Sequence, residues 1–294
     1  MLHRLLLSVC AKGCGGVFVV LRLTEQEKGF FKKRKQIKNI SRSPAVICKN
    51  AGGLPFFRVD VISGKKGIIW DGLTEKCGKY SSRIVAPRST PLPDGTGIKR
   101  FSPSSTVSTL IFNTAKNIIS QASPPPDSFC ITVTDRCALS ASRICELLPF
   151  CSVIRVVTLR PEKYSAACEK ALSESGATLI IRNSYEPTAK PDVVICCDGA
   201  VSAAMSDAAI FTFRKKNCGK VRFCGSGINL TDEHREFLPE GIDPLDFAAA
   251  LTELCGSRDY ASSCFADIET SCGKCASPLP ENCLLCHIRS NAKQ

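Results

Sequence analysis

Four cysteines near the C-terminus have the spacing of metal ligands. Cys272 and Cys275 form one C-x-x-C pair, and Cys283 and Cys286 form a second pair. Four thiolates at such paired spacing can close a tetrahedral zinc site. Seven residues separate the pairs, fewer than the roughly 15–20 of the common zinc pattern. The sequence therefore predicts either a small structural zinc site, which would fold the tail without implying catalysis, or a disordered Cys-rich tail over residues 258–294.

A second set of chemistry-bearing residues follows the apolar segments in the middle of the chain. Asp135 and Asp198 each come directly after such a segment, so they could pair as carboxylates for metal binding or for acid–base chemistry. Asp is also a common capping residue after a strand, and that structural role is the alternative. The candidate ligand-binding residues are Asp135, Arg136, Ser140, Arg160, Asp198 and Gly199.

The loop that would bind a dinucleotide lacks its usual glycines. The G-x-G-x-x-G fingerprint lets the backbone approach a pyrophosphate, whereas this chain has D-R-C-A-L-S at residues 135–140. A carboxylate there would repel a phosphate, although Arg136 and Ser140 could partly compensate. Arg160 stands where an arginine could receive a 2′-phosphate, or it is an ordinary surface arginine. The Gly-Ser-Gly at residues 225–227 follows a late strand, which is the wrong position for the fingerprint.

Alternating strands and helices must position these residues. Apolar, β-branched segments of the kind buried in a parallel sheet recur along this part of the chain. Strands that alternate with helices need right-handed crossovers, and hence a parallel sheet. The predicted fold class is therefore α/β, with a doubly wound, mostly parallel Rossmann-like sheet preceded by a small α/β unit. The spatial order 3-2-1-4-5, with a sixth strand at the edge, is expected for strands at 129–134, 153–159, 177–181, 192–197, 208–213 and 220–224.

Two helices are expected between the first three strands. One would follow the first strand, because Ala141, Ile144, Cys145 and Leu148 would share one face. The other would run from Pro161 to a stop at Gly176, because proline favours the first helical position and glycine favours the end.

A small α/β unit is expected over residues 51–123. Alternating apolar and polar residues from Phe56 predict its first strand, and a helix beginning at Ser104 or Ser105 would close it. The three prolines at 124–126 mark the expected boundary with the next domain.

The Rossmann-like domain is then expected over residues 127–257. Its last helix would begin at Asp243 and Pro244 and end at Gly256. That helix could pack on the parallel sheet or return to the small N-terminal unit.

The positive charge belongs mostly to the first 50 residues. They hold 11 Lys and Arg against Glu25 and Glu27, a net +9 of the total +12. Residues 1–50 are therefore expected to be a basic, poorly ordered leader, and nucleic-acid binding by the folded body is not expected. The run FFKKRKQIK at 30–38 is either a patch for nucleic acid or a membrane surface, or a solvated linker.

The middle of the chain resembles the cofactor domain of NAD(P)-dependent dehydrogenases at the level of the fold, over about a third of the sequence. The resemblance implies NAD(P) as a cofactor, but the missing glycines favour a small-ligand-binding or regulatory module without ordinary dinucleotide binding. An NAD(P)-dependent oxidoreductase with an atypical phosphate-binding loop is the alternative. With three histidines, none near the strand ends, the sequence assigns no catalytic residue.

The cysteine content indicates a reducing compartment. The chain has 19 cysteines, many inside apolar runs, where they behave as small buried hydrophobes. A chain of 294 residues does not need a disulfide framework to bury a core. A cytoplasmic protein without a membrane span is therefore expected.

Overall fold

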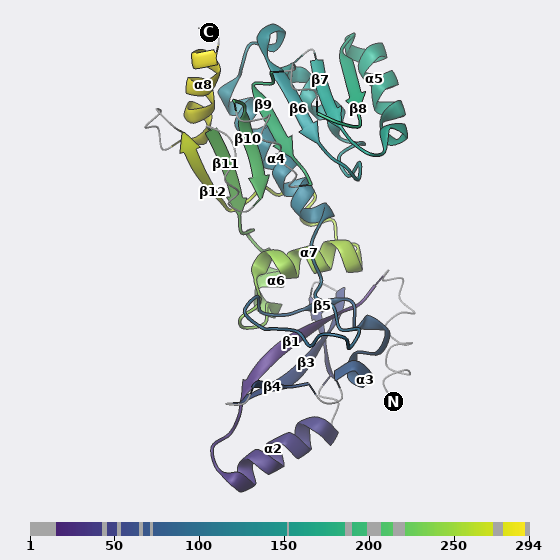
Figure 1. Ribbon diagram of the computed structural model, residues 1–294, viewed down its shortest axis with the longest axis vertical. Coiled ribbons are helices and arrows are strands. Elements are labelled where there is room, and N and C mark those ends of the chain that lie inside the picture. The colour runs from purple at the N-terminus through teal and green to yellow at the C-terminus, as the bar shows by residue number, and fades with distance from the viewer. Residues whose placement is uncertain are drawn as a thin grey trace. The chain divides into compact units, whose positions relative to one another are not determined.

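The computed structural model divides the chain into two compact units. The described residues are 16–42, 46–51, 54–64, 67–70, 73–151, 153–185, 190–198, 207–213, 221–272 and 279–291. We call Met1–Pro103 with Asn229–Tyr260 the N-terminal unit, and Ser104–Ile228 with Ala261–Gln294 the Rossmann-like unit. Figure 1 labels the helices and strands of both.

Seven strands in the Rossmann-like unit form one sheet, in the order β12-β11-β10-β9-β6-β7-β8. All neighbours are parallel except β11 and β12, which are antiparallel. The six parallel strands have the 3-2-1-4-5-6 order of a doubly wound sheet, with the switch point between β6 and β9, and the antiparallel β12 is a seventh strand at the edge. The predicted fold class is therefore confirmed. The strands are β6 (Cys130–Thr134), β7 (Val153–Val157), β8 (Thr178–Arg182), β9 (Val193–Cys196), β10 (Ala209–Phe213), β11 (Val221–Ser226) and β12 (Asp267–Cys272).

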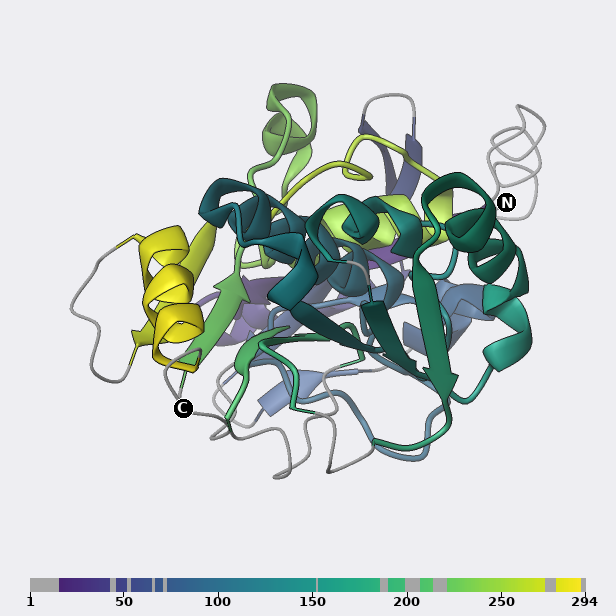
Figure 2. The ribbon, with the colours of Figure 1, turned by 90° about the horizontal axis from the view of Figure 1, so that it is seen from above.

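Helices cover this sheet and bury its central strands. All four residues of β9 and the alternating residues Ile131 and Val133 of β6 are fully buried. The helix α5 (Ser165–Ser175) contacts β8, and α8 (Pro280–Asn291) contacts β11 and β12. Figures 1 and 2 show α5 and α8 at opposite ends of the sheet. The expected helix from Pro161 is confirmed as the 3-10 turn η4 (Pro161–Tyr164) followed by α5, which ends at Gly176 in the left-handed conformation.

The helix expected directly after β6 is wrong. Residues 140–150 form turns and the 3-10 helix η3 (Ile144–Phe150). Ile144 and Leu147 are its fully buried residues, which is the i, i+3 spacing of a 3-10 helix and not the expected α-helical stripe. Pro149 lies inside the segment and removes a backbone donor that an α-helix would need.

The helix α4 (Ser105–Ala122) belongs to the Rossmann-like unit, so the expected boundary at the three prolines is wrong. It contacts β9 and β10 and buries Leu110, Ile111 and Ala115. The predicted apolar stripe is correct, but a stripe does not say which sheet it covers. Residues 124–126 only follow the end of this helix, where Ser123 is left-handed, and the short η2 (Pro126–Ser128) leads into β6.

The N-terminal unit is built on a second sheet, in the order β2-β3-β1-β5, with β4 paired to β3. The strand β1 runs parallel to both β3 and β5, whereas β2 and β4 are antiparallel to β3. The elements of this unit are β1 (Phe18–Glu25), α2 (Phe30–Arg42), β2 (Val46–Ala51), β3 (Leu54–Gly64), β4 (Gly67–Ile69), α3 (Leu73–Cys77), η1 (Gly78–Tyr80), β5 (Ile84–Val85), α6 (Asp232–Phe237) and α7 (Pro244–Cys255).

The expected leader is wrong for residues 16–42 and 46–51, which the structure describes as part of the N-terminal unit. Phe18, Val20 and Leu21 in β1 are fully buried, and β1 is central in its sheet. This apolar run is too short to span a membrane, but it has the length of a strand covered on both faces. Residues 1–15 lie outside the described residues.

The helix α7 packs on the sheet of the N-terminal unit, so the expected domain over 127–257 is wrong at its end. The ring of Phe247 lies edge-on to the rings of Phe18 and Phe56, at centroid distances of 6.0 and 5.4 Å. The side chain of Asp243 caps the helix by accepting from the Leu245 N–H at 2.8 Å. The predicted start and stop of the helix are correct, and the return to the N-terminal unit is one of the two alternatives that the sequence left open.

The chain from 261 onward folds into the Rossmann-like unit and is not a separate tail. β12 pairs with β11 along its whole length, and α8 contacts α4. Among the described residues, no helix has both the length and the apolar character needed to cross a bilayer.

Candidate functional site

The carboxylate of Asp135 lies at the end of β6 and is fully buried. It accepts hydrogen bonds from the backbone N–H groups of Leu139 and Ser140, at 2.9 and 2.6 Å. The hydroxyl groups of Ser140 and Tyr164 donate to the same carboxylate, at 2.6 and 2.8 Å. Because four donors surround one buried carboxylate, Asp135 holds the chain after β6 in a single closed turn.

Most backbone N–H groups of the loop 135–140 are already used inside the protein. The first two donate to the carbonyl of Val157 and to the carboxylate of Asp198, at 2.9 and 3.1 Å. That of Ala138 donates to the Asp135 carbonyl at 3.1 Å, and the last two donate to the Asp135 carboxylate. In a dinucleotide-binding loop such groups point at the pyrophosphate. Here carboxylates of the protein take that place, and no α-helix follows to add its dipole.

Asp198 ties β6 to β9 across the switch point. Its carboxylate accepts from the Thr134 hydroxyl at 3.2 Å and from the Arg136 N–H at 3.1 Å. Asp135 accepts from a different set of donors. The structure therefore places both carboxylates as acceptors for the polypeptide around the loop.

The structure brings four of the six predicted ligand-binding residues together at the switch point: Asp135, Arg136, Ser140 and Asp198. The fifth, Arg160, follows the neighbouring strand β7, and Gly199 lies outside the described residues. Ser140 is 4% exposed and its hydroxyl faces Asp135. The expectation that this hydroxyl would compensate for Asp135 toward a phosphate is therefore wrong.

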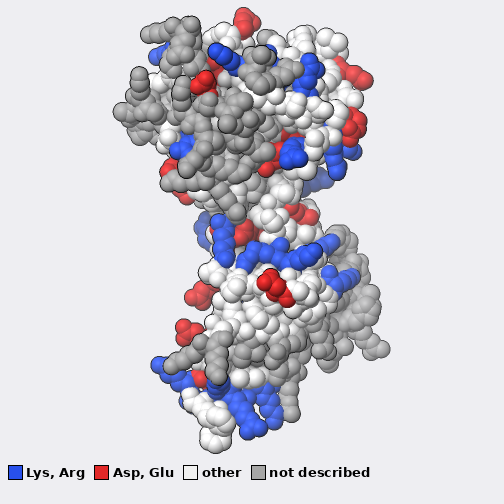
Figure 3. Space-filling model, in the orientation of Figure 1, with Lys and Arg blue, Asp and Glu red and all other residues white. Residues whose placement is uncertain are grey.

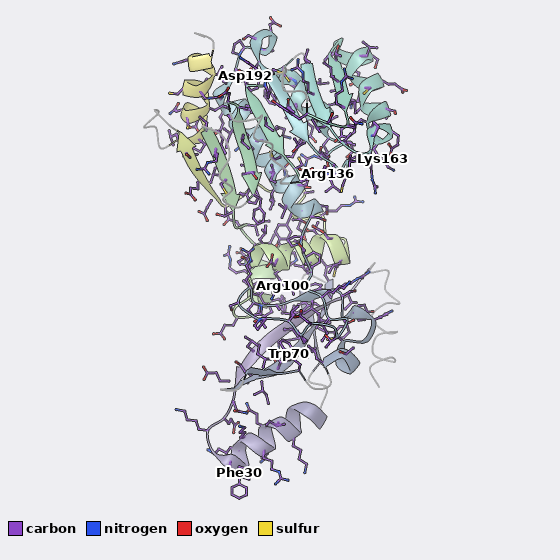
Figure 4. The ribbon with its side chains drawn as sticks, viewed as in Figure 1. Phe30, Trp70, Arg100, Arg136, Lys163 and Asp192 are labelled. Carbon is purple, nitrogen blue, oxygen red and sulfur yellow. The ribbon has the colours of Figure 1, made fainter. Side chains whose placement is uncertain are left out.

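Cationic side chains gather at the carboxyl ends of β6, β7 and β8. Backbone hydrogen bonds hold these ends side by side, since the Leu159 N–H donates to the Arg136 carbonyl at 3.3 Å and the Thr158 N–H donates to the Arg182 carbonyl at 2.8 Å. Figure 4 shows Arg136 and Lys163 at this edge, and Figure 3 shows Lys and Arg side chains over it. The four exposed residues that we call the cationic edge are Arg136, Arg160, Lys163 and Arg182.

Two leucines on the same loops are exposed. Leu139 is 43% exposed in the loop after β6, and Leu159 is 57% exposed in the loop after β7. Apolar surface beside cationic side chains suits a ligand that carries both an anionic group and an apolar part.

Two buried side chains beside the loop, the phenol of Tyr164 and the thiol of Cys197, have raised pKa values. Burial raises the pKa of Tyr164, and the negative charge of Asp135 acts in the same direction. Burial also raises the pKa of Cys197, again with a contribution from Asp135. Neither the phenol nor the thiol therefore supplies a base or a nucleophile near pH 7.

The glycine at 225 has a packing role. A Cβ at Gly225 would lie 1.9 Å from Cδ2 of Phe265, so no side chain fits between the strand β11 and this ring. The Phe265 ring also stacks on Phe213, with centroids 5.7 Å apart and an interplanar angle of 2°. Core packing thus explains Gly225, and Gly227 adopts a left-handed backbone conformation (φ +65°).

The predicted zinc ligands are only partly described. Cys283 is buried in α8 and disulfide-bonded, and Cys286 is exposed one turn later. A disulfide sulfur has no thiolate to offer a metal. Cys275 and the side chain of Cys272 lie outside the described residues. Within the described ranges there is no group of three or more His, Cys, Asp or Glu side chains that could hold a metal ion.

The N-terminal unit contains a hollow of about 690 Å³ that is lined by the single loop Thr90–Arg100. The guanidinium of Arg100 does not face a ligand there, because it donates to the carbonyls of Ala86, Pro87 and Thr90. These bonds show that Arg100 stabilises the loop to which it belongs.

Sequence reasoning missed three members of this arrangement. Tyr164 lies within the helix predicted from Pro161 to Gly176, but its hydroxyl bond to Asp135 has no local sequence signal. Lys163 and Arg182 do have a signal, because both stand near the carboxyl end of a predicted strand. A search of every strand end in the predicted sheet finds them.

The fold and the switch-point geometry define this unit as a Rossmann-like α/β domain with a closed loop in place of the glycine-rich one. No protein-family model matches the chain, and no curated protein matches it. Among solved structures, one that matches is the crystal structure of L-tryptophan dehydrogenase from Nostoc punctiforme, with 13% identity, 85% of this chain and 77% of that chain covered, and a TM-score of 0.33. The fold class of the Rossmann-like unit follows from its strand order and not from that likeness.

Proposed function

We propose that the Rossmann-like unit is a small-ligand-binding or regulatory module that takes an anionic ligand through the cationic edge, without ordinary dinucleotide binding. The observation that carries this proposal is the closed loop after β6. Its amides donate to Asp135 and Asp198, so a pyrophosphate would have to displace hydrogen bonds to charged acceptors. Each such bond contributes about 1.5–3 kcal/mol.

Binding of an anion by the side chains of Arg136, Arg160 and Lys163 does not require these loop hydrogen bonds to break. Arg136, Arg160 and Lys163 are exposed and extend from backbone that is fixed by the sheet. Arginine can bind a phosphate or a carboxylate with two parallel hydrogen bonds, and lysine adds a point charge. Side-chain recognition of an anion therefore needs no change in the loop.

The second candidate is an NAD(P)-dependent oxidoreductase with an atypical phosphate-binding loop. The strand order supports it, and so does the place of Arg160 after the second strand, where an arginine accommodates the 2′-phosphate of NADP. In this alternative the cationic edge would hold the 2′-phosphate while the pyrophosphate lay over the closed loop.

Isothermal titration of the full-length protein separates the two candidates. We expect no heat with NADH or NADPH, and weak binding of inorganic pyrophosphate that is lost in the double variant Arg136→Ala/Arg160→Ala. Lys170→Ala/Lys190→Ala is the matched control, because it also removes two exposed cations from the same unit.

Two results would reverse this assignment. Micromolar binding of NADH or NADPH that disappears in Arg136→Ala would support the oxidoreductase. If the double variant and the wild type bound pyrophosphate equally, the cationic edge would have no part in ligand binding under either candidate function.

A further inference from the structure

The helix α2 is an unusually cationic element of the N-terminal unit. Its 13 residues, FFKKRKQIKNISR, include six Lys and Arg and no Asp or Glu. Such a helix has no partner charges within itself, and its i, i+4 pairs are repulsive. The sequence therefore needs a reason outside the helix for this concentration of charge.

One face of α2 is attached to the unit and the other is exposed. The side chain of Gln36 donates to the Glu25 carbonyl and accepts from the Glu27 N–H, both at 2.9 Å. Gln36 and Ile37 are partly buried. These contacts hold the helix beside the end of β1, so its charged face has a fixed direction. The exposed cations away from Gln36 and Ile37 are Lys32, Arg34, Lys35 and Lys38, whereas Lys33 is exposed on the same side as these two residues.

Two phenylalanines begin the helix and are also exposed. Phe30 is 71% exposed and Phe31 is 83% exposed, the two largest values among the exposed large apolar residues of the described chain. Their rings pack only edge to face on each other, with centroids 5.6 Å apart. Figure 4 shows Phe30 pointing away from the unit, and Figure 3 shows uncharged surface beside blue surface at this end of α2.

We propose that α2 docks on a membrane surface that contains anionic lipids. The cations would lie at the level of the headgroups while Phe30 and Phe31 enter the boundary with the acyl chains. A basic helix that presents aromatic rings at one end has the composition of an interfacial anchor. Each Lys or Arg near an anionic bilayer strengthens the attraction, and burial of a phenyl ring adds to it.

A single-stranded nucleic acid is the other polyanion that this charge could attract, through phosphate contacts and stacking on exposed rings. The two rings lie together at one end of the helix and are not interleaved with the cations. That arrangement suits insertion into a lipid interface better than stacking along a strand. The charge and the apolar tip together favour the membrane surface.

Co-sedimentation of the full-length protein with lipid vesicles tests the proposal. We expect binding to vesicles of phosphatidylcholine with about 30% phosphatidylserine at low salt, and little binding to phosphatidylcholine alone. Raising the salt to about 0.5 M shortens the Debye length to a few ångströms and should release the protein.

Three double variants separate the contributions of the α2 cations, of the two phenyl rings and of the net charge of the protein. Lys35→Gln/Lys38→Gln should weaken the partition coefficient about 25-fold, at roughly fivefold for each charge. Phe30→Ser/Phe31→Ser should weaken it about tenfold or more at unchanged charge. Lys170→Gln/Lys190→Gln removes the same net charge from exposed positions of the Rossmann-like unit, and should bind as the wild type does.

The proposal is overturned by any of three results. The first is no binding to the anionic vesicles at low salt. The second is equal loss in the α2 lysine variant and the Lys170/Lys190 control, which would make the attraction one of net charge. The third is vesicle binding that is unchanged in the phenylalanine variant, together with wild-type binding to a single-stranded RNA of about 20 nucleotides that is tighter than its binding to the vesicles. That result would identify α2 as a nucleic-acid contact.

Discussion

The cationic edge and the exposed face of α2 are both rich in Lys and Arg, but they are assembled differently. The charges of α2 are neighbours in the sequence and lie on one helix. Those of the cationic edge come from three strand ends that are adjacent only because β6, β7 and β8 pair in parallel. A continuous helix can meet a flat, extended surface, whereas convergent strand ends present charges around one point. The difference predicts an extended partner for α2 and a small ligand for the cationic edge.

The largest expected effect is a loss of stability when the buried carboxylate of Asp135, which holds the loop after β6, is removed. Asp135→Ala leaves four donors without their acceptor, so we expect the free energy of unfolding to fall by about 3–5 kcal/mol, measured by urea denaturation. Tyr164→Phe removes one donor and should cost about 1 kcal/mol. Asp127→Ala, at an exposed position in η2, is the control. A loss below about 1 kcal/mol in Asp135→Ala would mean that the closed turn does not depend on this carboxylate.

The next effect separates the two cationic regions directly. Lys35→Gln/Lys38→Gln should lower vesicle binding about 25-fold, close to 2 kcal/mol, and leave pyrophosphate binding unchanged. Arg136→Ala/Arg160→Ala should do the reverse. Co-sedimentation and titration calorimetry on the same preparations measure both. If either double variant weakened both activities equally, the two regions would act as one nonspecific field.

A third group of cations, Lys116 and Arg143, converges on one acidic side chain. Glu146 accepts from Arg143 at 2.7 and 3.0 Å and also from Lys116. These bonds lower the pKa of Glu146 from 4.5 to about 2, and the hydrogen bond from Arg143 is the largest cause. Because the folded-state pKa is lowered, the stabilisation is complete above the unfolded pKa and is lost as the pH falls toward 2.

Glu146→Gln should therefore cost about 1 kcal/mol at pH 7, a figure reduced for the partial exposure of the pair. The difference between variant and wild type should shrink below pH 4.5 and be less than about half at pH 3. Urea denaturation at several pH values measures it. A cost that stays constant with pH would show that packing, and not the ion pair, is what the glutamate supplies.

The smallest expected effect is on stability at the cationic edge itself. Arg136→Ala and Arg160→Ala remove exposed side chains, so the free energy of unfolding should change by less than about 0.5 kcal/mol each. Thermal or urea unfolding checks this. A larger loss would assign these arginines to the structure of the loops and would weaken their role in ligand binding.

Local patterns predicted the elements of the Rossmann-like sheet well. The apolar runs at β6, β7, β9 and β10 could be recognised because buried parallel strands need continuous β-branched sequence. The stops at Gly176 and Gly256 were also readable, since both adopt the left-handed conformation that ends a helix. The candidate residues at the switch point followed from the general rule that strand ends of such a sheet converge.

Contacts between distant segments decided what those patterns could not. The apolar run at 17–21 had the composition of a strand, but only its pairing with Leu54–Gly64 makes it the centre of a sheet. The apolar faces of α4 and α7 predicted two helices but did not identify the sheet that each covers: α4 covers the sheet of the Rossmann-like unit, and α7 covers that of the N-terminal unit. Helical periodicity specifies a buried face and carries no information about the partner.

The sequence alone determined two features, the absence of a glycine-rich loop and the concentration of charge in residues 30–38, because both depend only on residue type and order. What the tertiary structure decided is how those residues are used. Asp135 turns inward and satisfies the loop amides, Ser140 and Tyr164 join it, and the arginines after β6 and β7 are left facing solvent. Hydrogen bonds of a buried carboxylate form between groups that only the folded chain brings together, so the direction of each side chain is a property of the fold.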